Sequence, residues 1–410
     1  MRPVFSITFA YHFGQVLKLC AFALIVYLFD YAVLGESALY LAYSLIIGGA
    51  IDLGTRYTCW TEVKEKNLDQ ACTSKILFSV CAAGILYGLF SATNYYFDVI
   101  ESTALVGICF ISGTLNFGNL DWFIIRKYSP AYFLSVVFAY NISPIVLIFT
   151  ASFLENGTLA VIAFPLGYTV SGFLVLLVSN RISLPKLSLF PIRSLLNNAL
   201  LVPGQHIFMQ AFIPLLGNIL KLESLGQLKM LSVLISSGVA AATFIVLGSY
   251  KAEKLRLSVF NQYLCSALFC VLILVPLVAL GILDTPWHVE LFGFDISLLL
   301  RAGCLSVLLA VLSYEQERLI FKGRQVVSLL ILYGYPAFLA LLVLLSASLE
   351  FSRTLEFGLH IMTLSSLIVA LPIAHYRNTE VSNLLFSPWF AKFALLITLL
   401  IDAGKLVKLM

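Results

Sequence analysis

The sequence predicts an all-α polytopic membrane protein with about twelve transmembrane helices. Of its 410 residues, 60% are hydrophobic and only 11% are charged, and the mean hydropathy is +0.98. Soluble domains carry roughly 25% charged residues, so this composition excludes a water-soluble enzyme. Several uninterrupted apolar stretches exceed the roughly 20 residues that a helix needs to cross a bilayer. They are apolar all round, whereas strands of outer-membrane barrels alternate with period two.

Charged residues and Gly, Pro or Asn separate the apolar runs into two groups of six. The first group covers residues 4–29, 38–58, 74–96, 103–124, 131–153 and 158–178. The second group covers residues 195–219, 228–249, 259–282, 294–315, 326–348 and 354–374. We therefore predict an N-terminal half over 1–180, a linker over 181–194 and a C-terminal half over 195–384. The apolar tail over 385–410 is short for a span, and its lysines predict an interfacial helix.

Lys and Arg are concentrated in alternate loops, which predicts the orientation of the chain. With the N-terminus in the cytoplasm, the outside loops hold only Lys221 and Arg353, and the other loop lysines and arginines lie inside. Positively charged loops stay in the cytoplasm, so the N-terminus is predicted to be cytoplasmic. The first run carries Lys18 and lacks an Ala-x-Ala site before Asp30, so we expect a retained span.

The sequence lacks the motifs of an ATPase or a hydrolase. It contains no Walker A loop, no HExxH and no nucleophile elbow, and its eight cysteines form no CxxC or Cys/His spacing. We therefore expect no metal, no cofactor, no nucleic-acid partner and no enzymatic activity. Polar residues within the spans are therefore the candidate functional residues, because burying a polar side chain in lipid costs free energy and such residues are usually functional.

The first span carries a polar stripe. Tyr11, Gln15 and Lys18 recur at helical spacing, and His12 lies one residue further round. A stripe of this kind favours a helix that faces a cavity. The alternative is that Lys18 snorkels along its four-carbon stem to the interface.

The seventh span is also polar, and Pro203 and Pro214 predict that it bends. Gln205, His206 and Gln210 either line a moving cavity or form hydrogen bonds between helices. His206 is a candidate proton-coupling group because histidine titrates near neutral pH, although a lone histidine is more often a neutral hydrogen-bonded residue.

Lys229 and Arg301 lie near the outer ends of the eighth and tenth spans. They either snorkel towards headgroups or point inward and form a cationic chamber with Lys18. Such a chamber would suit an anionic substrate such as a diphosphate.

Two carboxylates near the cytoplasmic ends of spans are candidate gate or coupling groups. Asp52 precedes Arg56 by four residues, which predicts a local ion pair, or else a coupling carboxylate if Asp52 faces the chamber. Asp121 is followed by Trp122, which predicts an interfacial anchor for that helix end.

Several short motifs resemble one known family. They are Glu36-Ser-Ala-Leu-Tyr-Leu-Ala-Tyr-Ser-Leu running into Ile51-Asp-Leu-Gly, Asp121-Trp122, Leu291-Phe-Gly-Phe and Phe321-Lys-Gly-Arg-Gln. With length and span number, they resemble the Wzx-type lipid-linked O-antigen flippases, in the polysaccharide-transporter branch of the MOP (MATE-like) exporters. Ile125-Arg126 replaces the family's usual Gln-Gly after Asp-Trp.

The resemblance implies two six-helix lobes around a cavity that opens alternately to either side. The implied substrate is an undecaprenyl-diphosphate-linked oligosaccharide, moved from the cytoplasmic to the periplasmic leaflet of a bacterial inner membrane. A coupling ion, H⁺ or Na⁺, and a polysaccharide polymerase partner are implied as well. Three alternatives remain: an ion-coupled MATE-type exporter of small molecules, a membrane polysaccharide polymerase, and a purely structural membrane protein.

Overall fold

The computed structural model is helical and contains no strand among the residues that it describes. These are residues 2–97, 103–179, 198–233, 296–321, 324–348 and 354–375, with 184–186, 189–191, 193 and 195 of the connecting segment. The chain divides into two compact units, Met1–Met230 and Leu231–Met410. The division into two lobes at 181–194 remains a prediction, and the helices predicted over 259–282 and 385–410 lie outside the described residues.

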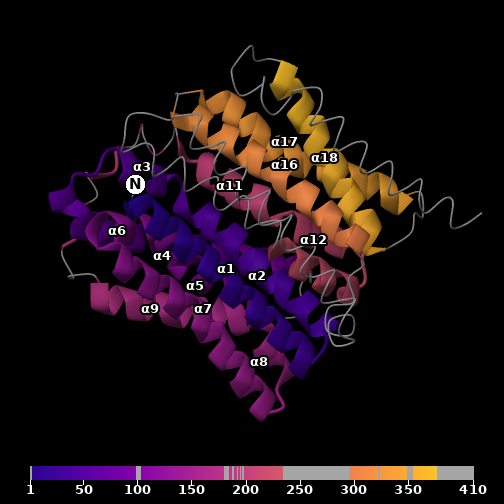
Figure 1. The fold of residues 1–410 in the computed structure, drawn as a ribbon. Helices are drawn as coiled ribbons and strands as arrows, with labels where there is room; N and C mark the ends of the chain where they lie inside the picture. Colours follow the sequence, from indigo (N-terminus) through magenta and orange to yellow (C-terminus); the bar gives the residue numbers. More distant parts are fainter. Residues whose placement is uncertain are drawn as a thin grey trace, which may run out of the picture. The chain divides into compact units, whose positions relative to one another are not determined.

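The first unit contains all described helices that precede Met230 (Figure 1). They are α1 (Arg2–Leu28), α2 (Tyr31–Asp52), α3 (Thr55–Thr61), α4 (Leu68–Phe97), α5 (Thr103–Leu115), α6 (Phe117–Lys127), α7 (Pro130–Phe153), α8 (Gly157–Val161), α9 (Ala163–Ser179), α11 (Leu201–Gln210) and α12 (Phe212–Gly217), with a 3₁₀ turn at Glu65–Asn67. The helical residues 222–230 end the unit. The second unit contains α16 (Ile296–Phe321), α17 (Gln325–Ser348) and α18 (Leu355–His375), which pack on one another.

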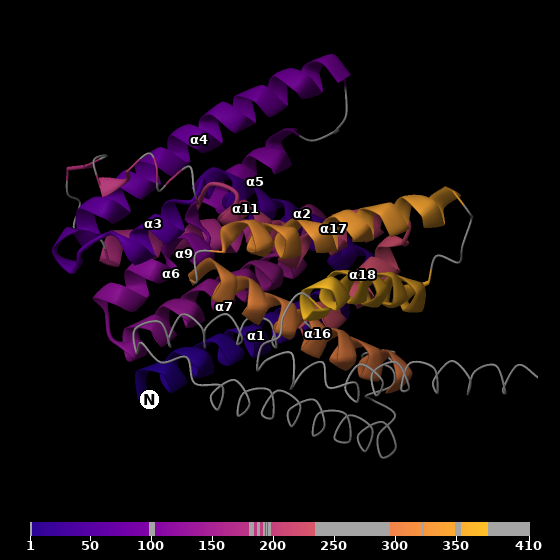
Figure 2. The same cartoon turned by 90° about the horizontal axis from the view of Figure 1, so that it is seen from above.

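Helix α2 is the centre of the first unit, because it contacts α1, α4, α5, α8, α9, α11 and α12. Figure 2 shows α4 at the edge of the unit beside α5. The apolar side chains of α4 are largely exposed, with Leu77, Val80, Ile85 and Leu89 at 46–65%. An exposed apolar face of this length suits contact with lipid, whereas about half of α2 is buried within the protein.

Glycines allow α2 to lie very close to its neighbours. A Cβ atom added to Gly48 would lie 2.8 Å from the carbonyl oxygen of Gly113 on α5, and one added to Gly35 would lie 2.1 Å from the carbonyl oxygen of Leu222. A Cβ on Gly226 would lie 2.1 Å from the carbonyl oxygen of Tyr31, so the second contact is reciprocal. Small residues of this kind let helix backbones touch in membrane proteins.

The predicted spans coincide with helices over most of the described residues, with differences in detail. The second predicted span, 38–58, is interrupted after Asp52, the fourth at Asn116 and the sixth at Ile162. The second span was expected to begin near residue 38, with Asp30 and Glu36 in a loop, but α2 begins at Tyr31. Asp30 is its N-cap, because the Asp30 carboxylate accepts a hydrogen bond of 2.7 Å from the backbone N–H of Val33. An acidic cap satisfies an N–H group that the helix itself leaves unbonded.

Five stretches of the described residues are long and apolar enough to cross a membrane. They are Tyr31–Asp52, Glu65–Thr93, Ala104–Lys127, Ala131–Phe153 and Gln325–Ala347. Phe13–Leu28, Ala163–Ser179 and Leu355–Val369 are shorter apolar helices. The protein is therefore a multi-pass membrane protein, while twelve spans and a cytoplasmic N-terminus remain predictions.

Candidate functional site

Lys18 and Lys229 come together in the first unit. Lys18 lies in the middle of α1, and Lys229 lies in the helical residues 222–233. The Nζ atom of Lys229 lies 5.6 Å from the ring centre of Phe22, one turn after Lys18 on α1. The two lysines are close enough for their charges to interact. Lys229 is only 6% exposed and Lys18 is partly exposed, so Lys229 is buried against the part of α1 that carries Lys18 and Phe22.

The Phe22 ring is held in place from its other side. It contacts Phe164 of α9, with ring centres 4.9 Å apart. A cation near an aromatic ring is attracted by the electrons of the ring face, which offsets part of the cost of burying the Lys229 charge. The repulsion between the two ammonium groups remains, and an anion between them would relieve it.

The other predicted site residues of the first unit do not all join this pair. Gln15 is partly exposed on α1, and Gln205, His206 and Gln210 are partly exposed on α11. The buried Oε1 atom of Gln210 has no hydrogen-bond partner within the described residues. His12 lies on α1, but its side chain is outside the described part of the structure.

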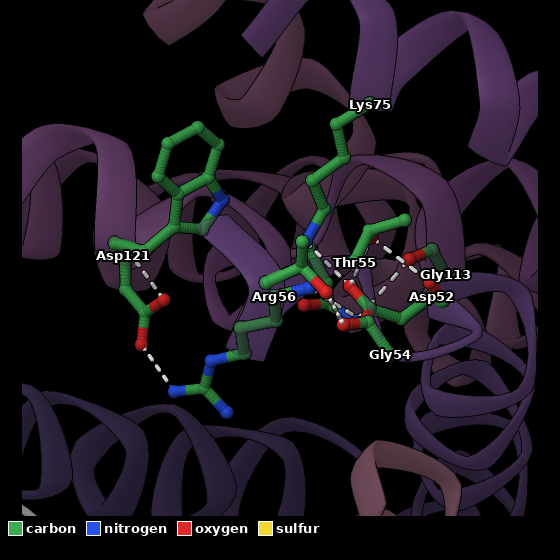
Figure 3. Close-up of polar contacts among 10 residues, drawn as sticks. Asp52, Gly54, Thr55, Arg56, Lys75, Gly113 and Asp121 are labelled. Carbon is green, nitrogen blue, oxygen red and sulfur yellow. Dashed lines mark hydrogen bonds and ion pairs between the residues drawn. The ribbon is translucent and has the colours of Figure 1, made fainter. Parts of the chain in front are cut away.

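A second polar cluster lies at the end of α2. The carboxylate of Asp52 pairs with the ammonium group of Lys75 on α4, and both side chains are almost completely buried (Figure 3). The same carboxylate accepts a hydrogen bond of 3.0 Å from the backbone N–H of Arg56 and one of 3.1 Å from the Thr55 hydroxyl. Three donors therefore occupy Asp52.

The Arg56 side chain extends to α6 instead. Its guanidinium pairs with Asp121 at 2.5 Å, and the other Asp121 oxygen accepts a hydrogen bond of 2.6 Å from the backbone N–H of Trp122 (Figure 3). The expected side-chain pair of Asp52 with Arg56 is thus wrong. Trp122 is completely buried and lies 5.9 Å from Lys75, so it is not the exposed interfacial anchor that we expected.

A left-handed turn explains why the partners differ from the helical expectation. Helix α2 ends at Asp52, and Leu53 and Gly54 have φ values of 46° and 82°. A carboxylate and an arginine four residues apart face each other only in a continuous helix. Beyond the turn, the backbone N–H of Arg56 belongs to the first turn of α3, where it has no helical acceptor and binds Asp52.

Helix α2 also touches α11, and the turn touches the residues just before α11. A Cβ atom on Gly54 would lie 2.6 Å from the carbonyl carbon of Asn198, and one on Gly49 would lie 2.7 Å from the His206 ring. His206 lies within electrostatic range of Asp52 and Lys75. The cluster therefore connects the first predicted half of the chain with the start of the second.

Arg301 belongs to the second unit, so the structure does not test whether it joins Lys18. Its side chain is 7% exposed and meets His360 of α18, which the sequence analysis did not single out. No cluster of three or more His, Cys, Asp or Glu that could hold a metal ion occurs among the described residues.

Comparison with known proteins was made by sequence and by structure. No protein-family model and no curated protein matches the sequence. The structure is similar to an outward-facing MATE-family multidrug resistance transporter of the MOP superfamily, with a TM-score of 0.56 and 15% identity over 90% of this chain and 93% of that one. The chain has the fold of MATE transporters. A MATE protein in complex with MaD5 matches with a TM-score of 0.55 and 15% identity over 90% of this chain and 93% of that one.

A third solved structure is also similar. It is a MOP-superfamily transporter from Pyrococcus furiosus, described as having a binding pocket of reversed polarity that suggests a different function. Its TM-score is 0.52 at 13% identity, over 97% of this chain and 96% of that one. At such identities the likeness establishes the MATE fold alone, and the chemistry must be argued from the residues of this chain.

Proposed function

We propose that this MATE-fold protein is a flippase for undecaprenyl-diphosphate-linked oligosaccharides. It moves O-antigen or related repeat units from the cytoplasmic to the periplasmic leaflet of a bacterial inner membrane. Twelve spans in two six-helix lobes, a cytoplasmic N-terminus and alternating access are parts of the same proposal.

The pairing of Lys18 with Lys229 carries this proposal. Removing one charge from water costs several kcal/mol even after the protein relaxes, and placing a second like charge beside it adds repulsion. A diphosphate group presents negative charge to both ammonium groups at once. A binding site of this polarity favours an anionic headgroup over a cationic drug.

In this proposal, different polar residues bind different parts of the substrate. Lys18 and Lys229 hold the diphosphate. Gln15, Gln205 and Gln210 hydrogen-bond sugar hydroxyls, and His12 and His206 extend the polar wall. A buried amide oxygen without a partner is costly, so the Gln210 Oε1 atom is suited to accept a hydroxyl group.

The Asp52, Arg56 and Asp121 cluster is assigned a gating role rather than ion coupling. Its carboxylates are already occupied by Lys75, Arg56 and backbone N–H groups. A carboxylate that is engaged in this way holds helices together, and a bound cation would have to replace those donors.

The decisive experiment measures the sidedness of lipid-linked glycan in cells that lack the gene. A probe that reaches only the periplasmic leaflet should leave single repeat units unlabelled, because they remain in the cytoplasmic leaflet. Accumulation of single units on the periplasmic side would indicate a polymerase instead. Unchanged glycan together with new sensitivity to cationic drugs would favour the MATE-type exporter.

Variants of the two lysines test the site itself. Lys18→Ala and Lys229→Ala should each lower complementation at least about tenfold, as loss of a charged hydrogen bond to an anion does, whereas Lys18→Arg should keep part of it. Lys64→Ala removes an exposed lysine and serves as the control with wild-type activity. Comparable membrane insertion of all variants is required, and full activity of Lys18→Ala would remove Lys18 from the mechanism.

A further inference from the structure

The ring of Phe22 lies where the two lysines of the first unit approach each other. Phe22 follows Lys18 by four residues on α1, so the two side chains share one face of the helix. The Nζ atom of Lys229 lies 5.6 Å from the centre of the Phe22 ring, within the range of about 6 Å over which an aromatic face attracts a cation. Phe22 is only 2% exposed, so little water screens this attraction.

Packing fixes the orientation of the Phe22 ring. Its neighbour is the Phe164 ring of α9, with ring centres 4.9 Å apart, and Phe164 in turn contacts the Tyr168 ring at 6.2 Å. Tyr168 contacts the Tyr140 ring of α7 at 6.0 Å, and the Tyr140 hydroxyl donates a hydrogen bond of 2.6 Å to the carbonyl oxygen of Leu115 on α5. The four aromatic side chains are at most 6% exposed. This continuous row of ring contacts across α9 and α7 leaves the Phe22 ring little freedom to move.

The Phe22 ring opposes the repulsion between the two lysines. The charge of Lys18 acts on Lys229, and like charges repel. The flexible stem of Lys229 would therefore let its ammonium group turn away from α1. Phe22 belongs to the same helix as Lys18, so attraction to the ring draws the Lys229 ammonium group back towards α1. The ring thus keeps the second positive charge beside the first without help from an anion.

A site whose charges are already assembled binds an anion more tightly than one that must first bring them together. The apparent affinity falls with the fraction of the protein in which the binding arrangement exists. Lys18 is partly exposed, so an anion can approach from the side of Lys18 while Lys229 stays buried against Phe22. The ring can therefore raise the affinity for an anion without touching it.

We propose that Phe22 is a positioning residue of the anion site. Attraction to its ring holds the Lys229 ammonium group beside Lys18 and so prepares the site for a group with two negative charges. The contacts of Phe22 with Lys229 and Phe164 carry this proposal. That the anion is the diphosphate of a lipid-linked oligosaccharide rests on the proposed flippase function, whereas the positioning of Lys229 does not depend on it.

Fluorinated phenylalanines separate this role from simple packing. Phe22→Leu would remove the ring and also leave a cavity, so it is not the variant of choice. Fluorine is only slightly larger than hydrogen, but each added fluorine withdraws electrons from the ring face and weakens its attraction for a cation. Phe110 of α5 is the matched control, because it is 8% exposed and also contacts one aromatic ring, that of Tyr87, at 5.5 Å.

Nuclear magnetic resonance of ¹³C-labelled lysine in the full-length protein tests the position of Lys229. Protons above an aromatic face resonate upfield, so the Cε protons of Lys229 should be shifted upfield, and Lys229→Arg assigns their signal. The shift should shrink as 4-fluoro-, 3,5-difluoro- and 3,4,5-trifluorophenylalanine replace Phe22, because the ammonium group leaves the weakened ring. The same replacements of Phe110 should not change it. A wild-type signal without an upfield shift, or a shift that the series at Phe22 leaves in place, would overturn the proposal.

Binding of inorganic pyrophosphate to the same proteins, measured by isothermal titration calorimetry, tests the effect on the site. The affinity should fall with each fluorine at Phe22, and the trifluorinated residue should lower it by about threefold to thirtyfold, the range that loss of a buried cation–π contact allows. The same residue in place of Phe110 should change the affinity by less than about twofold. Equal losses at both positions would assign the effect to packing and refute the positioning role.

These measurements keep the two proposals apart. Pyrophosphate binding that is unaffected by the series at Phe22 would refute the positioning role and leave the anion site intact. Absence of pyrophosphate binding by the wild-type protein would refute the anion site on which the flippase proposal rests, and the lysine signals would still decide whether Phe22 holds Lys229.

Discussion

The buried ion pair between Asp52 and Lys75 should be a major source of stability in the first unit. Asp52 is fully buried and Lys75 is 2% exposed, so neither charge can turn to water when its partner is removed. Breaking a buried ion pair by removing one partner typically costs about 3–5 kcal/mol. We therefore expect Asp52→Asn and Lys75→Met each to lower the free energy of unfolding by about 3 kcal/mol or more.

The chain offers a matched control for this prediction. Asp69 and Lys127 form a similar pair between α4 and α6, but their side chains are 30% and 21% exposed. Solvent-exposed ion pairs contribute about 0–1 kcal/mol, so Asp69→Asn should lower the free energy of unfolding by less than about 1 kcal/mol.

Unfolding of the purified protein in mixed detergent and SDS measures these differences. The double variant Asp52→Asn/Lys75→Met should lose less than the sum of the single losses, with a coupling of at least about 1 kcal/mol. Equal losses in Asp52→Asn and Asp69→Asn, or strict additivity of the first two variants, would refute the reasoning that burial makes the Asp52 pair important.

Three further predictions concern the backbone of α2. Gly226→Ala should weaken the contact between α2 and residues 222–230, because its Cβ would lie 2.1 Å from the Tyr31 carbonyl oxygen; unchanged cysteine cross-linking between these segments would contradict this. Gly54→Ala should lower the free energy of unfolding by about 1–2 kcal/mol, the strain of a left-handed backbone, because its φ is +82°; an unfolding curve like the wild type's would oppose it. Asp30→Ala should cost about 1 kcal/mol by loss of the N-cap of α2, measured in the same way, and Asp30→Asn should retain most of the stability.

The positions of the helices could be predicted because the lipid bilayer imposes one strong requirement on the sequence. A helix that crosses hydrocarbon must be apolar for about 20 residues, and such runs are visible without any knowledge of packing. The predicted runs at 131–153 and 326–348 match α7 and α17 closely. The start of α2 was missed because Asp30 was taken as a loop charge when it caps the helix.

The contacts of the polar residues depend on packing, and one sequence could not supply them. Lys18 was selected because it lies deep within an apolar run, whereas its approach to Lys229 depends on how residues 222–230 return to α1. His360 was overlooked because a lone histidine in an apolar helix carries no pattern. The only available signal was that Arg301 and His360 both lie about two turns from the starts of their helices.

The Asp52 cluster shows how a turn of two residues decides what a sequence pattern means. If the segment were one continuous helix, Asp52 and Arg56 would form a local pair that connects no other helix. With Leu53 and Gly54 in the left-handed region, the backbone turns, Arg56 reaches α6, and Lys75 of α4 takes its place at Asp52. Gly54 lies against Asn198 and Ala199, just before α11, where a Cβ atom would come within 2.6 Å of the carbonyl carbon of Asn198. The hydrogen bonds from the Thr55 hydroxyl and the backbone N–H of Arg56 to the Asp52 carboxylate span this turn, so they hold it in the conformation that makes the contact.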